Sequence, residues 1–78
     1  MRVRTEFTSE PFTTGEPSTH ATAALAVVEH SGLPHDFGPF GTSVWGDSTE
    51  LIPLLATVLE AVLANGGTRL TLQVELDE

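Results

Sequence analysis

The sequence contains no cysteine, no lysine and no tyrosine, and each absence excludes a kind of chemistry. Without cysteine there is no disulfide, no thiolate nucleophile and no cysteine-ligated metal. Lysine and tyrosine are also common catalytic groups, and no serine lies in a nucleophile-elbow sequence. We therefore expect a protein that is not an enzyme. The lack of cysteine suits a reducing compartment, so we expect a cytoplasmic location.

Positive charge is scarce, since the chain has only three arginines but eleven acidic residues, and its formal net charge is −8. Such a charge repels nucleic acid and anionic membranes, and it favours cationic or neutral ligands. Acidic charge also keeps small proteins soluble, which is the simpler interpretation of composition alone. We expect no nucleic-acid partner.

Long apolar runs are missing as well. No stretch approaches the ~20 residues that span a bilayer, and the start of the chain lacks the apolar segment of a signal peptide. We expect no membrane insertion. With 78 residues, the chain is expected to form a single domain over residues 1–78. A domain of this size buries only about 60% of its unfolded surface, and such domains often gain stability as oligomers. We expect a homodimer or a homotetramer.

Two kinds of hydrophobic pattern divide the chain into six elements. Period-2 alternation predicts strands at residues 2–11, 35–37, 42–46 and 68–76. Apolar stripes predict a helix from Ser18 to about Ser31 and a second helix that begins near Asp47 and ends before Asn65. The order is therefore strand, helix, two strands, helix, strand.

In the second helix the expected buried stripe is broad, as is the apolar face of the last strand. The stripe consists of Leu51, Leu55, Val58 and Val62, widened by Ile52, Leu59 and Leu63. In the last strand the apolar residues are Leu70, Leu72, Val74 and Leu76, which alternate with polar ones. We expect this apolar face to pack on the helices.

This order is that of the split βαβ arrangement and predicts an α+β, ferredoxin-like βαββαβ sandwich. Two helices are expected on one face of a four-stranded antiparallel sheet, with the first and last strands at its centre. The face without helices then carries Glu6, Thr8, Glu10, Ser43, Trp45, Thr71, Gln73 and Glu75. A polar face with one tryptophan suits either a partner sheet or a ligand.

Several short segments, in order and with nearly constant spacing, carry a resemblance to a known family. They are Glu6–Pro11, Ser31–Leu33, Pro39–Ser43, Gly46–Asp47, Glu60–Val62, Thr68–Arg69 and Leu76–Asp77. Together they resemble the small thiamine-binding protein family (the YkoF-like group). The resemblance implies a ferredoxin-like fold and assembly through the sheets into dimers or tetramers. It also implies non-covalent binding of thiamine or its hydroxymethylpyrimidine moiety, in salvage, transport or regulation.

The resemblance also implies which residues hold the ligand. Hydroxyls for the aminopyrimidine are available at Thr8, Thr42 and Ser43, and carboxylates for the thiazolium cation at Glu10 and Asp47. Trp45 is a candidate aromatic platform, together with Phe12 and Phe40. Gly41 is expected to let the backbone approach the ligand closely. Relatives often carry Glu at the position of Trp45 and Lys at that of Glu75, so ligand choice can differ here.

Several of these residues also have a purely structural interpretation. Asp47 suits a helix cap, Trp45 a subunit interface, and Glu10 the end of a strand. The histidines show no metal-ligand spacing, so we expect no metal and no cofactor beyond thiamine as the ligand. The alternative function is a structural or regulatory sheet-pairing module without a small ligand. A small dimeric catalyst that uses pocket carboxylates is a third hypothesis.

The charge distribution also predicts which form of thiamine binds. There is no lysine, and Arg2, Arg4 and Arg69 are scattered rather than clustered. The helix N-terminus expected near the pocket opens with Asp47, whose carboxylate repels phosphate. Unphosphorylated thiamine is therefore expected to bind better than thiamine diphosphate.

Overall fold

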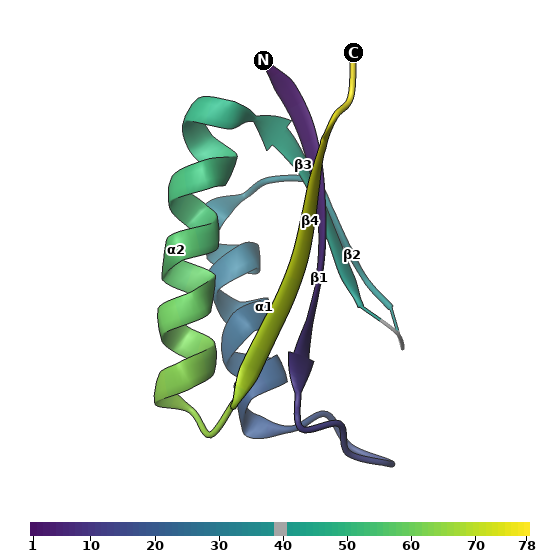
Figure 1. Cartoon of the computed structure of the whole chain (residues 1–78), viewed down its shortest axis with the longest axis vertical. Coiled ribbons are helices and arrows are strands. Elements are labelled where there is room, and N and C mark those ends of the chain that lie inside the picture. The colour runs from purple at the N-terminus through teal and green to yellow at the C-terminus, as the bar shows by residue number, and fades with distance from the viewer. Residues whose placement is uncertain (39–40) are drawn as a thin grey trace.

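A computed structural model describes residues 1–38 and 41–78 and contains the six expected elements in the expected order (Figure 1). They are β1 (Arg2–Glu10), α1 (Thr19–Ser31), β2 (His35–Phe37), β3 (Thr42–Asp47), α2 (Ser48–Ala64) and β4 (Arg69–Leu76). Every boundary lies within about one residue of its prediction. Residues 39–40, which include the candidate platform Phe40, lie outside the described residues.

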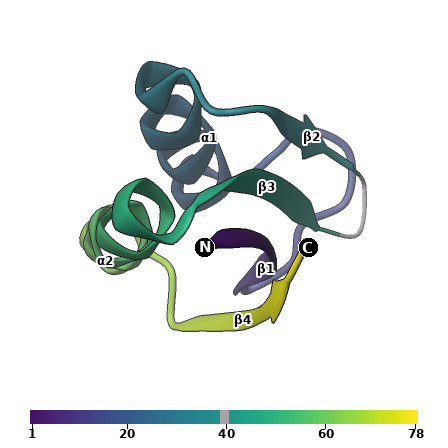
Figure 2. The ribbon, with the colours of Figure 1, turned by 90° about the horizontal axis from the view of Figure 1, so that it is seen from above.

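The four strands form one antiparallel sheet in the order β2-β3-β1-β4. Figure 2 shows both helices on the same face of this sheet, which confirms the ferredoxin-like α+β fold. The expectation that the last strand lies at the sheet centre is wrong, because β4 is an edge strand. Each βαβ unit leaves a gap between its own two strands, and a strand of the other unit fills that gap. The inserted strands, β1 and β3, are therefore the central ones.

Local sequence signals define the ends of both helices. Ser18 caps α1, and its hydroxyl accepts a hydrogen bond from the backbone N–H of Ala21. Gly32 ends α1 with a φ of 74°, a conformation that glycine adopts without steric cost. Asp47 caps α2 by accepting from the backbone N–H of Thr49, 3.0 Å away. The predicted caps are thereby confirmed.

The core lies between the two helices and the central strands. Its buried apolar residues are Val3, Phe7, Ala24, Val28, Val44, Leu51, Leu55, Val58 and Val62. The central stripe predicted for α2 is thus confirmed. No helix among the described residues is long and apolar enough to cross a membrane.

The predicted widening of this core is wrong. Ile52, Leu59 and Leu63 of α2 are 40–56% exposed. The apolar face of β4 is also mostly exposed, with Leu72, Val74 and Leu76 between 40% and 64%. Only Leu70 of that strand packs against the core. The reason is the position of β4 at the sheet edge, because the two helices cover mainly the central strands.

Candidate functional site

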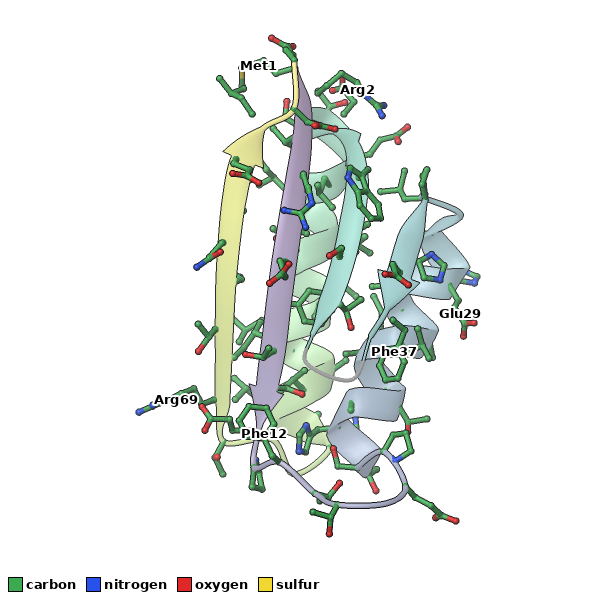
Figure 3. The ribbon with its side chains drawn as sticks, turned by 90° about the vertical axis from the view of Figure 1, so that its right-hand side faces the viewer. Met1, Arg2, Phe12, Glu29, Phe37 and Arg69 are labelled. Carbon is green, nitrogen blue, oxygen red and sulfur yellow. The ribbon has the colours of Figure 1, made fainter. Side chains whose placement is uncertain are left out.

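A cavity of about 330 Å³ opens at the end of the sheet where β1 stops and α1 begins. It lies among the end of β1, the connection to α1, the first turns of α1, and the adjoining ends of β2 and β3. Its lining residues are Phe7, Thr8, Ser9, Pro11, Phe12, Thr13, Gly15, Glu16, Pro17, Ser18, Ala21, Ala24, Phe37, Gly38, Gly41 and Thr42. Figure 3 shows Phe12 just beyond the end of β1 and Phe37 on β2.

One wall is held in place by a histidine that the sequence patterns did not single out. His20 is only 4% exposed, with Nδ1 2.8 Å from Ser9 Oγ and Nε2 2.9 Å from the Pro11 carbonyl oxygen. A carbonyl can only accept, so Nε2 carries a proton and donates it to the Pro11 carbonyl; in the neutral ring, Nδ1 then accepts from the Ser9 hydroxyl. This pair of bonds ties the first turn of α1 to the segment that leaves β1.

The opposite wall is built by the first residues of β3. Thr42 is 4% exposed and lies between Phe7 of β1 and Phe37 of β2 in the sheet register. A Cβ added at Gly41 would lie 3.1 Å from the Phe7 carbonyl oxygen and 3.2 Å from a methyl carbon of Thr8. Gly41 therefore permits a close approach of its own backbone to β1, which differs from the close approach to a ligand that we expected.

The lining combines hydroxyl groups, two phenylalanines and one carboxylate. Ser9, Thr13 and Ser18 use their hydroxyls in internal hydrogen bonds. By contrast, the hydroxyls of Thr8 and Thr42 have no hydrogen-bond partner among the described residues. Phe12 and Phe37 are 71% and 40% exposed, which leaves aromatic surface at the cavity.

Charge at the cavity comes from Glu16 and from a helix terminus. None of the described lining residues is basic. The helix N-terminus beside the cavity is that of α1, through Ser18 and Ala21, and the first turn of α1 contains no acidic residue. The expectation that Asp47 opens the helix nearest the pocket is therefore wrong. The partial positive charge of α1 opposes the full negative charge of Glu16 only weakly.

The structure distributes the six predicted site residues over four places. Thr8 and Thr42 line the cavity, whereas Ser43 and Trp45 lie on the sheet face without helices. The Arg4 guanidinium lies 5.8 Å from the centroid of the Trp45 ring and is 3.0 Å from Glu75. Arg4 is thus the centre of a polar cluster on this face.

Glu10 ends β1 and Asp47 ends β3, at opposite ends of the sheet, and neither lines the cavity. Glu10 is 3.9 Å from Arg69 in an exposed ion pair. Asp47 lies across from Arg2, at the far end of the sheet. The backbone N–H of Thr49, followed by its hydroxyl, holds the pKa of Asp47 below its ordinary value, and the terminal ammonium of Met1 adds to this effect. This carboxylate therefore has a structural role as the cap of α2.

Sequence reasoning placed the site mainly on the strands and, apart from Phe12, missed the segment between β1 and α1. Residues 11–18 supply seven of the lining residues, among them Glu16 and Ser18. The sequence signal that could have indicated this segment is its set of turn-forming residues. One of them is Gly15, whose φ in the structure is 87°. Within residues 1–38 and 41–78, no group of three histidine or acidic side chains could hold a metal ion.

The chain is similar to known proteins in sequence profile and in fold. The profile of a family described as "Thiamine-binding protein" matches residues 5–78. A protein from Streptococcus pneumoniae shares the fold with a TM-score of 0.82 at 18% identity, over 100% of this chain and 89% of that one. A domain of unknown function from Bacillus cereus gives 0.72 at 19% identity, over 95% and 72% of the two chains.

A third solved structure has a provisional link to thiamine. It is a protein from Thermotoga maritima, provisionally assigned to thiamine biosynthesis or salvage, with a TM-score of 0.70 at 17% identity. The likeness covers 96% of this chain and 81% of that one. At these identities the likeness concerns the fold alone. Among curated protein sequences, none matches this chain.

Proposed function

The chain belongs to the thiamine-binding protein family, and we propose that it binds thiamine, or its hydroxymethylpyrimidine moiety, non-covalently in the cavity between β1 and α1. One observation carries this proposal. The family match over residues 5–78 includes every residue that lines the cavity, so the cavity belongs to the part of the chain that defines the family.

The chemistry of the cavity is compatible with such a ligand. Its volume of about 330 Å³ falls in the range of small-molecule sites. The hydroxyls of Thr8 and Thr42 can exchange hydrogen bonds with an aminopyrimidine edge. Phe12 and Phe37 offer aromatic surface to a flat cation, and Glu16 offers it a negative charge.

The proposed role is binding rather than turnover, in salvage, transport or regulation of the vitamin. His20, which supports the cavity wall, has both ring nitrogens engaged by Ser9 and Pro11. A general base needs a free nitrogen within reach of a substrate proton. His20 therefore serves the shape of the wall. The active form is proposed to be a homodimer or a homotetramer.

A second candidate function is a sheet-pairing module without a small ligand. The observation that favours it is the helix-free face of the sheet, where Arg4 joins Trp45, Glu6 and Glu75. Such a face can recognise another polar sheet. A sheet-pairing module requires no ligand in the cavity. The two candidate functions therefore predict different results when thiamine is titrated into the protein.

The test is calorimetric titration with thiamine and with hydroxymethylpyrimidine, and choline serves as a simple cation control. Ala21→Phe should fill the cavity and abolish binding while the fold persists, as checked by circular dichroism. Ala26→Phe adds the same ring at an exposed position on α1 and should bind as the wild type does. Absence of binding to both ligands, or equal binding by the Ala21→Phe variant, would contradict the proposal and favour the sheet-pairing module.

A further inference from the structure

The hydroxyl groups that line the cavity differ in what they can offer a ligand. A hydroxyl carries one hydrogen and two acceptor lone pairs. The hydroxyls of Thr8 and Thr42 have no partner among the described residues, so each can donate to a ligand or accept from it. A hydroxyl whose hydrogen is already taken by the protein can only accept. Ser9 is in this second state, and the cause is His20.

His20 fixes the hydrogen of the Ser9 hydroxyl. The ring donates from Nε2 to the Pro11 carbonyl at 2.9 Å, so in the neutral ring Nδ1 carries no hydrogen and can only accept. Nδ1 lies 2.8 Å from Ser9 Oγ. The Ser9 hydroxyl therefore donates its only hydrogen to His20. In the described part of the chain no donor reaches Ser9 Oγ, so both of its lone pairs remain available to a ligand.

The position of Ser9 makes this polarity important for binding. Ser9 lies two residues beyond the buried Phe7 on the helix side of β1, and it lines the cavity. The side chain of Ser9 is half-buried, and that of His20 is only 4% exposed. A ligand group that cannot donate would place one acceptor against another at this point. Such a mismatch is costly where water is excluded.

The other hydroxyls with internal hydrogen bonds are less selective. Thr13 also donates its hydrogen, to the Glu16 carbonyl at 3.0 Å, but its side chain is exposed, so water can pair with its lone pairs. Ser18 accepts from the Ala21 N–H and keeps its own hydrogen for a ligand. Among the described lining hydroxyls, that of Ser9 is therefore the half-buried one that can only accept.

Thr42 offers a complementary group next to Ser9. It pairs with Phe7 in the sheet register, and Ser9 follows Phe7 by two residues on the same face of β1. Diagonal neighbours of this kind have Cα atoms roughly 7–8 Å apart. One small heteroaromatic ring can therefore reach a hydroxyl that only accepts and a second hydroxyl that is free to donate. An aminopyrimidine matches this pair, because its amino group donates and its ring nitrogens accept.

We propose that Ser9 is a specificity-determining residue of the cavity, which selects pyrimidines with a 4-amino group over pyrimidines with a 4-oxo group. The amino group donates to Ser9 Oγ, whereas an oxo oxygen can only face its lone pairs. His20 is a positioning residue, because it acts through the Ser9 hydroxyl and does not itself line the cavity. This inference rests on the proposed binding of thiamine or its hydroxymethylpyrimidine moiety, and it names the group of the ligand that is recognised.

The test compares thiamine with oxythiamine, in which a carbonyl replaces the amino group of the pyrimidine. In calorimetric titration at pH 8, where an imidazole is neutral, the dissociation constant of oxythiamine should be roughly tenfold to a hundredfold higher. Ser9→Ala removes the acceptor and should narrow this ratio to about threefold or less. Ser48→Ala makes the same change at the start of α2, outside the cavity lining, and should keep the wild-type ratio.

A second variant tests the part played by His20. His20→Phe keeps a ring of similar size but offers no acceptor, so the Ser9 hydroxyl can turn its hydrogen toward the ligand. The ratio of the two affinities should then narrow even though Ser9 is present. A purely structural role of His20 would lower both affinities by the same factor and leave the ratio unchanged. His30→Phe, at an exposed position of the same helix, is the control, and circular dichroism checks the fold of both variants.

The outcomes separate this inference from the proposed function. Binding of neither compound would contradict the proposed function, and this inference with it. Equal binding of both compounds by the wild type, or a preference for thiamine that Ser9→Ala retains in full, would overturn the assignment of Ser9 alone. An unchanged ratio in folded His20→Phe would overturn the positioning role of His20.

Discussion

Nδ1 of His20 lies 2.8 Å from Ser9 Oγ, which joins the first turn of α1 to the end of β1. Nε2 of the same ring donates to the Pro11 carbonyl at 2.9 Å. His20→Ala removes both bonds, takes this donor from the Pro11 carbonyl and opens a void where the buried ring was. We expect a loss of about 2–3 kcal/mol in the free energy of unfolding, measured with urea.

A control variant shows whether the loss of stability is specific to His20 or follows the removal of any histidine from α1. His30 lies in the last turn of the same helix and is exposed. His30→Ala should change the stability by no more than about 0.5 kcal/mol. If the two variants lose equal stability, the link between His20 and the cavity wall has no energetic importance.

The elements and their order were predictable because they depend on local patterns. Ser18, Gly32 and Asp47 end their helices through contacts within a few residues, so the sequence alone indicates them. The exposure of Leu72 and Val74 depends instead on which strand occupies the sheet edge. Alternation along β4 identifies two faces, but it does not show whether a helix covers either of them.

The candidate site was only partly predictable for a similar reason. Thr8 and Thr42, two of the residues that the family resemblance implies as ligand contacts, border the cavity. Trp45 and Asp47 lie farther along β3, three and five residues beyond Thr42, which corresponds to about 10 and 17 Å in an extended strand. Glu16 lies at the cavity because of the path of the loop, and His20 supports the cavity wall through its hydrogen bonds to Ser9 and Pro11. Neither placement follows from a pattern of single residues.

Replacement of Thr42 by valine tests the hydroxyl proposed to meet the ligand. The side chain is 4% exposed, and valine has nearly the same shape, so the melting temperature should stay close to that of the wild type. The affinity for thiamine should fall about fivefold, since one hydrogen bond contributes about 1 kcal/mol. Calorimetric titration measures this, with Thr57→Val on the exposed face of α2 as the control. Unchanged affinity would place the ligand away from Thr42.

Because Asp47 caps α2 in its ionised form, its contribution to the free energy of unfolding should decrease as the pH falls. Its pKa lies below the ordinary value of 3.8 in the folded chain, because the Thr49 N–H and hydroxyl bind the ionised form. The unfolded chain thus takes up the proton first, so the cap stabilises the fold above about pH 4 and loses this effect as the pH falls through the folded pKa.

Asp47→Asn keeps a capping oxygen but removes the charge. The wild type should be more stable than this variant at pH 7, and the difference should narrow below about pH 4. Urea unfolding at a series of pH values measures the difference. Glu60→Gln, which removes an exposed carboxylate without removing a cap, is the control. A wild-type advantage that is constant from pH 7 to about pH 3 would show that the charge of Asp47 is not involved.

Discrimination between thiamine and thiamine diphosphate tests the electrostatics of the cavity. The described lining residues include Glu16 but no arginine or lysine, and the chain carries a net charge of −8. The N-terminus of α1 favours an anion by only about 0.3–1 kcal/mol. We therefore expect thiamine to bind about tenfold more tightly than the diphosphate, a difference of ~1.4 kcal/mol. Glu16→Gln should narrow this gap by weakening thiamine and strengthening the diphosphate.

The measurement should be calorimetric, at matched ionic strength and without magnesium, because Trp45 lies on the helix-free face and does not border the cavity. Magnesium would neutralise the diphosphate and hide the effect of Glu16. Glu29→Gln removes an equal charge at an exposed position of α1 outside the cavity lining, and it should leave the ratio of the two affinities unchanged. A diphosphate that binds as tightly as thiamine would mean that the α1 N-terminus, rather than Glu16, dominates the potential at the ligand.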